Sequence, residues 1–209
     1  MHLTEAVLAP LRGRYGEPQP LVWEGEVSAD EFTLAGGSPE RRHDVTFFVF
    51  DRDGRLALIR KPQYAPGLWR PPGGGVRPEE QFEAGVRREA MEELGVPIEL
   101  ERFLVSSEAR FRCAEGVIDW RTHVFLARTD AEELDPLDRR EIAAARWGRL
   151  DELAGPLRTA MLATGRALWR YRVALHDAAL VRLGHVRGTV PRPWPQGTRG
   201  EAELRSQGR

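Results

Sequence analysis

The sequence is poor in several features that mark particular protein classes. One cysteine, Cys113, occurs in 209 residues, so neither an intrachain disulfide nor a cysteine-based zinc site can form. No stretch approaches the about 20 apolar residues of a membrane-spanning helix. The first residues lack the basic and apolar segments of a signal peptide. We therefore expect a cytoplasmic protein without a membrane partner, and the single cysteine fits a reducing compartment.

An excess of charge of one sign is also missing. The chain has 31 lysines and arginines against 32 acidic residues, a net charge of −1. This balance gives no whole-chain attraction to nucleic acid, which we do not expect as a partner. Lysine is almost absent: Lys61 is the single lysine, and the remaining residues of the 31 are arginines. Arginine-rich codon usage explains this bias, but the forked guanidinium donors also suit phosphate groups.

Hydrophobic periodicity and turn residues predict the order of the elements. Helices are expected at residues 4–14, 79–94 and 156–183, the second with Pro78 in its first turn and Gly95 as its C-terminal cap. Strands are expected at residues 21–27, 45–50, 56–60, 98–105, 109–112, 118–127 and 142–147. A loop at 62–75 and charged residues at 132–140 separate them. This order predicts an α/β sandwich with a mixed central sheet rather than a repeating βαβ fold.

The chain divides into four segments by composition. Residues 1–42 form an N-terminal extension, and residues 43–155 hold the core. The expected helix at 156–183 follows. Residues 184–209 are rich in glycine, proline and arginine, a composition typical of a disordered tail.

The most informative pattern is a stripe of carboxylates. Glu89, Glu92 and Glu93 stand at positions i, i+3 and i+4, just after the glycines at 73–75. On a helix they share one face, where like charges repel and destabilise the helix. A glutamate-rich face is ordinarily just solvated. A hard divalent cation bound by oxygen ligands is the simplest functional compensation for this repulsion.

The spacing around the stripe extends from Gly74 to Val96. Five residues separate Gly74 from Glu80, and seven more precede Arg88-Glu89-Ala90-Met91-Glu92-Glu93-Leu94-Gly95-Val96. This pattern resembles the signature of the Nudix hydrolase family at every position, although Ala90 is smaller than the aliphatic residue usual there. A Walker-type phosphate loop is excluded, because no Gly-Lys-Ser/Thr follows the glycines.

The resemblance implies a Nudix-type fold and a reaction. Members hydrolyse the pyrophosphate linkage of a nucleoside diphosphate joined to another group, X. A bound Mg²⁺, which Mn²⁺ can replace, neutralises the diphosphate and activates the attacking water. The nucleotide preferred here is a nucleoside triphosphate or dinucleoside polyphosphate, followed by ADP-ribose-like molecules. Homodimers are common in the family, and a homodimer is expected here.

The resemblance also implies roles for the residues of the signature. Glu92 and Glu93 correspond to metal ligands, and Glu89 to a ligand or the general base. A backbone carbonyl of Gly73 or Gly74 is a further expected ligand. Side chains that orient these carboxylates are expected at two positions, Arg88 and Glu80.

The sequence offers two candidates for the general base. Some relatives use the glutamate of the Arg-Glu pair, here Glu89, and others use a glutamate on a later loop. Glu141, which opens Glu-Ile-Ala-Ala-Ala-Arg-Trp, resembles that later glutamate. It can equally be a surface charge beside a strand.

Substrate contacts and an alternative function complete the predictions. Arg60, Lys61 and Arg70 are candidates for phosphate contacts, and the alternative is that they are solvated cations. Tyr64 and Trp69 are candidates for base stacking, and the alternative is packing in the core or a loop. A catalytically silent Nudix-like domain that senses a nucleotide is the alternative function, although such domains often lose signature glutamates and this chain keeps all of them.

Overall fold

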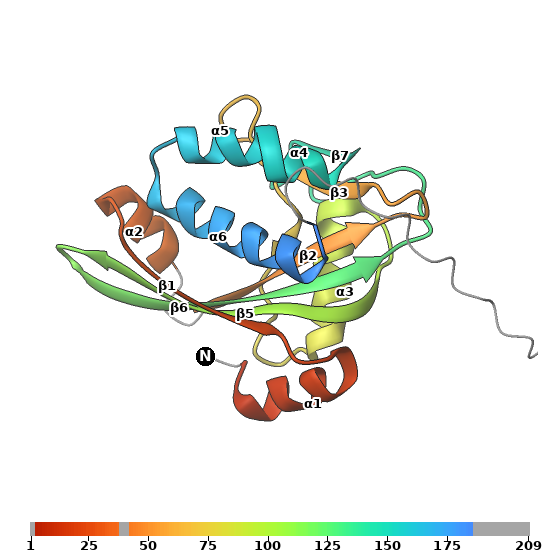
Figure 1. The fold of residues 1–209 in the computed structure, drawn as a ribbon, viewed down its shortest axis with the longest axis horizontal. Coiled ribbons are helices and arrows are strands. Elements are labelled where there is room, and N and C mark those ends of the chain that lie inside the picture. Colours follow the sequence, from red (N-terminus) through yellow and green to blue (C-terminus); the bar gives the residue numbers. More distant parts are fainter. Residues whose placement is uncertain (1–2, 38–41, 186–209) are drawn as a thin grey trace, which may run out of the picture.

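The computed structural model describes residues 3–37 and 42–185. A mixed sheet of seven strands lies between two layers of helices, with α1 and α3 on one face and α2, α5 and α6 on the other (Figure 1). The predicted α/β sandwich is therefore confirmed. Most of the expected disordered tail, residues 186–209, lies outside the described residues. In the part that is described, no helix is long and apolar enough to cross a membrane.

The elements have the following bounds. The helices are α1 (Glu5–Tyr15), α2 (Ala29–Gly36), α3 (Phe82–Leu94), α4 (Leu150–Glu152), the π-helical turn η1 (Leu153–Leu157), α5 (Arg158–Ala163) and α6 (Ala167–Arg182). The strands are β1 (Gln19–Glu26), β2 (His43–Phe50), β3 (Leu56–Arg60), β4 (Gly73–Gly74), β5 (Glu99–Cys113), β6 (Gly116–Arg128) and β7 (Ala144–Gly148).

The sheet has the strand order β1-β5-β6-β2-β3-β7, and the short β4 pairs with β2. Two pairs are parallel, β1 with β5 and β6 with β2, and the others are antiparallel. Strand β1, from the expected N-terminal extension, thus extends the sheet of the core. Because β4 pairs with β2, the glycine loop is held next to a central strand.

Strand β2 is buried on both faces, as expected of a central strand covered by helices on both sides. Val45, Phe47 and Val49 pack in one apolar cluster with residues of α1 and α3. Phe48 and Phe50 pack in the other cluster with residues of α5 and α6. The period-2 alternation of side chains thus builds two cores from one strand.

The predicted helix at 79–94 begins three residues later than expected. Pro78 lies in a turn closed by the Glu80 N–H and the Arg77 carbonyl, 3.2 Å apart, instead of in the first helical turn. Helix α3 starts at Phe82, after Gln81 as its N-cap. Gly95 ends it in a left-handed conformation with φ 72°, its N–H bonded to the Met91 carbonyl, so the predicted cap is confirmed.

The expected division of residues 98–112 into two strands was wrong. The strands expected at 98–105 and 109–112 form the single long β5, which pairs with β6 along its length. The polar residues between them do not end the strand, because Ser107 is buried and its hydroxyl bonds the Tyr171 hydroxyl at 2.5 Å.

The helix expected over 156–183 is divided in the structure. Residues 164–166 interrupt it between α5 and α6, with Gly165 at φ 69°. The turn before α5, η1, contains Pro156.

Helix α2 was not predicted at all, although Ser28 and Glu31 form a capping box at its start.

Candidate active site

The glycine strand β4 and helix α3 contact each other through two glutamates. The Gly73 N–H donates to Glu93 Oε2 at 2.6 Å. A Cβ atom at Gly74 would lie 2.0 Å from Glu89 Oε2, closer than real atoms approach. Gly74 therefore leaves the space that the Glu89 carboxylate fills, and this close approach requires glycine.

Arg88 gathers the polar groups of the signature around one guanidinium. It donates to both carboxylate oxygens of Glu80, at 2.9 and 3.0 Å, and to the Gly75 carbonyl at 2.9 Å. Its Nη1 reaches Glu89 Oε1 at 2.9 Å and Glu92 Oε2 at 2.8 Å. The spacing thus brings Arg88, Glu80 and two of the stripe glutamates together, and Arg88 offsets the repulsion between those two.

Glu93 is the most buried carboxylate of the stripe, with 2% of its surface exposed. Besides Gly73, its neighbours are two cations, Lys61 Nζ and Arg70 Nη2, each 3.6 Å from Oε1. That oxygen has no hydrogen-bond partner among the described residues. Burial raises the pKa of Glu93, and Arg70 and Lys61 act in the opposite direction.

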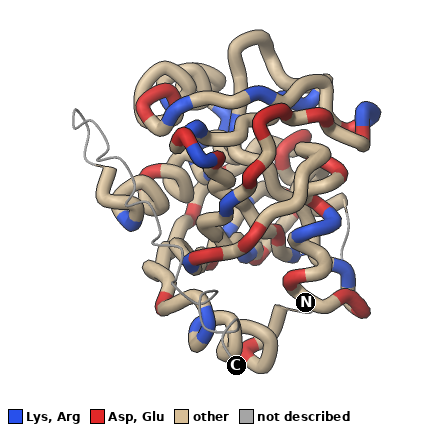
Figure 2. The backbone as a smooth tube through the Cα atoms, turned by 90° about the vertical axis from the view of Figure 1, so that its right-hand side faces the viewer, with Lys and Arg blue, Asp and Glu red and all other residues tan. Residues whose placement is uncertain are grey.

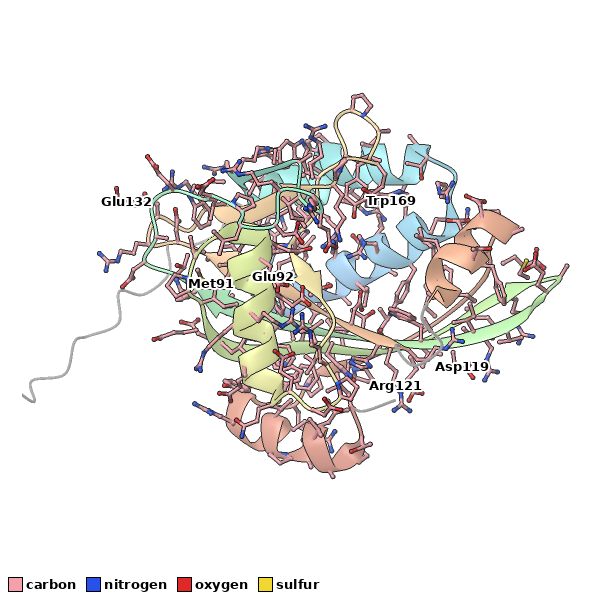
Figure 3. All side chains as sticks on the ribbon, turned by 180° about the vertical axis from the view of Figure 1, so that it is seen from behind. Met91, Glu92, Asp119, Arg121, Glu132 and Trp169 are labelled. Atoms are coloured by element: carbon pink, nitrogen blue, oxygen red, sulfur yellow. The ribbon has the colours of Figure 1, made fainter. Side chains whose placement is uncertain are left out.

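The other two carboxylates differ in exposure. Burial raises the pKa of Glu89 above its ordinary value, and the hydrogen bond from Arg88 partly opposes this rise. The Glu92 side chain is 38% exposed, and it is the outermost of the three. Figure 3 shows it on α3, the helix that lies in front of the sheet in that view. The stripe therefore runs from a buried carboxylate to an accessible one.

These groups fit a hard divalent cation in their chemistry. All are oxygen donors, which Mg²⁺ prefers, and Glu93 Oε1 lacks a hydrogen-bond partner within the described chain. Their arrangement is less complete, because no three or more His, Cys, Asp or Glu residues in the described part surround one point. Arg88 holds Glu89 and Glu92, while Glu93 turns toward Gly73.

Glu141 reaches the site through Lys61. Lys61 follows β3, and its ammonium donates to the Glu141 carboxylate while lying 3.6 Å from Glu93 Oε1. The Glu141 side chain is 54% exposed, whereas Lys61 is 14% exposed. The loop before β7 thus places Glu141 beside a cation that also faces the stripe.

Arg70 connects the stripe to the opposite layer of helices. Its side chain is 4% exposed, and its Nε donates to the Tyr64 hydroxyl at 2.7 Å. The Tyr64 ring meets Trp169 of α6 edge-on, with centroids 5.0 Å apart. Trp169 was not among the expected site residues, because no sequence spacing places α6 against the 62–75 loop.

Trp69 and Arg60 face each other at the end of β3. The Arg60 guanidinium lies 5.8 Å from the Trp69 ring centroid, and that of Arg146 lies 4.8 Å away. Both distances are within the range of cation–π contacts. Trp69 is therefore held by arginines in the present arrangement, and a base could stack on it only beside these contacts.

Residues 40–168 match the NUDIX domain family, so the chain belongs to this family, as the signature predicted. The match begins before β2 and ends two residues into α6. A Nudix hydrolase is thus confirmed as the enzyme class. Proteins of this family generally use divalent metal ions.

Named relatives share the same region. The chain is 32% identical over 130 residues to an RNA pyrophosphohydrolase of Caulobacter vibrioides, covering 54% of this chain and 75% of that protein. It is 34% identical over 115 residues to the NAD-capped RNA hydrolase NudC of Chromobacterium violaceum, covering 54% and 41%. Among solved structures, a MutT NUDIX hydrolase of Burkholderia pseudomallei is 32% identical, with 64% and 98% covered and a TM-score of 0.42.

Proposed function

We propose that this protein is a Mg²⁺-dependent pyrophosphohydrolase of nucleotides, cleaving the pyrophosphate linkage of a nucleoside diphosphate joined to X. The observation that carries the proposal is the single cluster formed by the glutamates of α3, Arg88 and the β4 glycines. The named relatives support it, because RNA pyrophosphohydrolase, NAD-capped RNA hydrolase and CTP pyrophosphohydrolase are all named for nucleotide substrates.

The cation would be held by Glu92 and Glu93, with a backbone carbonyl of Gly73 or Gly74, and Glu89 would lie beside it as the third carboxylate of the stripe. When bound, the cation would neutralise charge on the diphosphate and lower the pKa of the attacking water. Arg88, with Glu80 behind it, orients Glu89 and Glu92 through its forked donors. Loss of a group in such a role typically costs about 10- to 100-fold in metal affinity or activity. We assign Mg²⁺ because all the donors are oxygens, and Mn²⁺ can replace it.

Glu89 is the group that we assign as the general base. A base works best when its pKa lies near the operating pH, and burial raises the pKa of Glu89 toward that range. Glu141 instead holds Lys61 beside Glu93. In this assignment Glu141 positions a cation and does not accept the proton.

The substrate assignment remains that of a nucleoside triphosphate or a dinucleoside polyphosphate, with ADP-ribose-like nucleotides next. Arg70 and Lys61 lie at the stripe and suit phosphate oxygens. Two relatives are named for RNA substrates, so a 5′-triphosphorylated RNA belongs among the substrates tested.

A nucleotide panel with Mg²⁺ or Mn²⁺ tests the proposed function. Nucleoside triphosphates, dinucleoside polyphosphates, ADP-ribose and a 5′-triphosphorylated RNA are incubated with the protein, and the products are measured as phosphate, directly or after phosphatase treatment. We expect cation-dependent hydrolysis that a chelator abolishes. Tight nucleotide binding with no hydrolysis across the panel would instead support the sensing domain.

A further inference from the structure

Helix α6 places an arginine beside the loop that carries Arg70. Arg172 follows Trp169 by three residues, so both lie on one side of the helix. Trp169 contacts Tyr64 at 5.0 Å between ring centroids, and Tyr64 accepts the Arg70 Nε hydrogen bond at 2.7 Å. The packing of Trp169 on Tyr64 thus brings this part of α6 to Arg70 from a distant part of the sequence. In agreement with this placement, burial and then the charge of Arg70 lower the pKa of Arg172.

Arg172 differs from Arg70 in its hydrogen bonding and ion pairing within the described chain. Arg70 faces Glu93 and two hydrogen-bond acceptors. Arg172 is half-buried, and nothing in residues 3–37 and 42–185 forms a hydrogen bond or ion pair with its guanidinium. Tyr64, Asp44 and Tyr171 favour its charge. Of these, Tyr64 already accepts from Arg70, and Asp44 already accepts from Thr122 at 2.5 Å. A partly buried cation next to a like charge is unfavourable unless an anion joins them.

A second unsatisfied group lies one turn further along α6. His176 is 3% exposed, and its Nε2 has no hydrogen-bond partner among the described residues. Burial lowers the pKa of His176 well below its usual range, and Arg172 and Arg70 lower it further. This part of α6 therefore holds an excess of positive charge beside a buried nitrogen without a hydrogen-bond partner. The positive charge favours a bound anion.

We propose that Arg172 and Arg70 together bind a phosphate group of the substrate, and that Arg172 favours substrates with phosphate beyond the cleaved linkage. The proposal rests on the proposed function. It extends that function to the choice of substrate, because Arg70 Nη2 lies 3.6 Å from Glu93 Oε1 and so joins the arginine pair to the carboxylate stripe. Arg172 lies outside residues 40–168, the range that matches the family. Its planar fork suits a phosphate in two-point contact.

Two substrates and three variants test the proposal. Kinetics are measured for a nucleoside triphosphate, which has an additional phosphate, and for ADP-ribose, which has only its diphosphate. We expect Arg172→Gln to raise KM for the triphosphate by roughly ten- to a hundredfold, the loss of a charge-assisted hydrogen bond, with kcat nearly unchanged. ADP-ribose kinetics should stay close to wild type. Arg172→Lys should recover part of the triphosphate affinity.

Arg170→Gln is the matched control, because Arg170 lies on the same helix but is exposed and bonds only the Gly165 carbonyl. It should change neither substrate. Equal losses for both substrates, or unchanged kinetics in Arg172→Gln, would overturn the proposal while leaving the hydrolase intact. A wild-type protein that hydrolyses nothing would instead overturn the proposed function. In that case the Arg172–Arg70 pair is tested separately, by titrating wild type and Arg172→Gln with inorganic pyrophosphate in the absence of divalent metal. Equal binding to the two proteins would overturn the proposed phosphate site.

Discussion

Two of the helices that flank the sheet, α3 and α6, carry opposite chemistry, and their roles were not equally predictable from the sequence. Helix α3 carries the carboxylate stripe, whose members interact through neighbouring turns and through Arg88 on the same helix. Helix α6 carries Arg172 and Trp169, which meet the site only through Tyr64 and Arg70 of a distant loop. Spacing within one helix can thus indicate a reaction, whereas the residues that select a substrate depend on tertiary packing.

Overall charge does not reveal this division. Acidic and basic residues are interleaved along the described chain (Figure 2), in agreement with a net charge of −1. The contrast is local, between a carboxylate cluster on one side of Arg70 and an uncompensated arginine on the other. Substitutions on each side should therefore fail in different ways, in turnover on the α3 side and in substrate affinity on the α6 side.

The largest effect is expected on the α3 side, from Glu92→Gln and Glu93→Gln. Loss of an outer supporting group costs about 10- to 100-fold in metal affinity or activity, so loss of a ligand should lower turnover by at least about 100-fold. The fold should survive, because glutamine at 93 still accepts the Gly73 N–H bond. Turnover is measured in saturating magnesium.

Glu83→Gln is the control for these variants. It makes the same change in the first turn of α3, where Glu83 contacts Arg14 and Tyr15 instead of the stripe. It should keep wild-type turnover. Wild-type turnover in both Glu92→Gln and Glu93→Gln would contradict the metal assignment.

A smaller loss is expected from Gly74→Ala, which leaves every carboxylate in place. The added Cβ would lie 2.0 Å from Glu89 Oε2, so the carboxylate must move away from β4. We expect turnover to fall by about 10- to 100-fold, as for the loss of a group that orients a ligand. Gly13→Ala in α1, where a Cβ meets nothing within 4 Å, should leave turnover unchanged. An active Gly74→Ala enzyme would show that Glu89 need not stay against the loop.

The limits of the sequence reasoning follow from the range of each interaction. The spacing of Glu89, Glu92 and Glu93 and the cap at Gly95 depend on contacts within one helix, so local pattern was sufficient. The break at Gly165 lies in a stretch whose apolar period continues on both sides, which concealed it. The pairing of Arg172 with Arg70 leaves no periodic signal, because it depends on how α6 packs on the sheet.

The smallest effect is expected from Glu141→Gln, and it distinguishes the two candidate bases. Glu141 is 54% exposed and pairs with Lys61, and an exposed ion pair contributes at most about 1 kcal/mol, or roughly fivefold in rate. Burial raises the pKa of Glu89, so its ionised form, and with it kcat, is lost as the pH falls through a value above the ordinary 4.5. Glu141→Gln should retain this acidic limb of the kcat–pH profile. Glu89→Gln should lower turnover by at least about 100-fold, the lower end of the range for loss of a general base. If Glu141→Gln instead removes the limb together with most of the turnover, the proton acceptor is Glu141, and the helix that carries the metal ligands does not also carry the base.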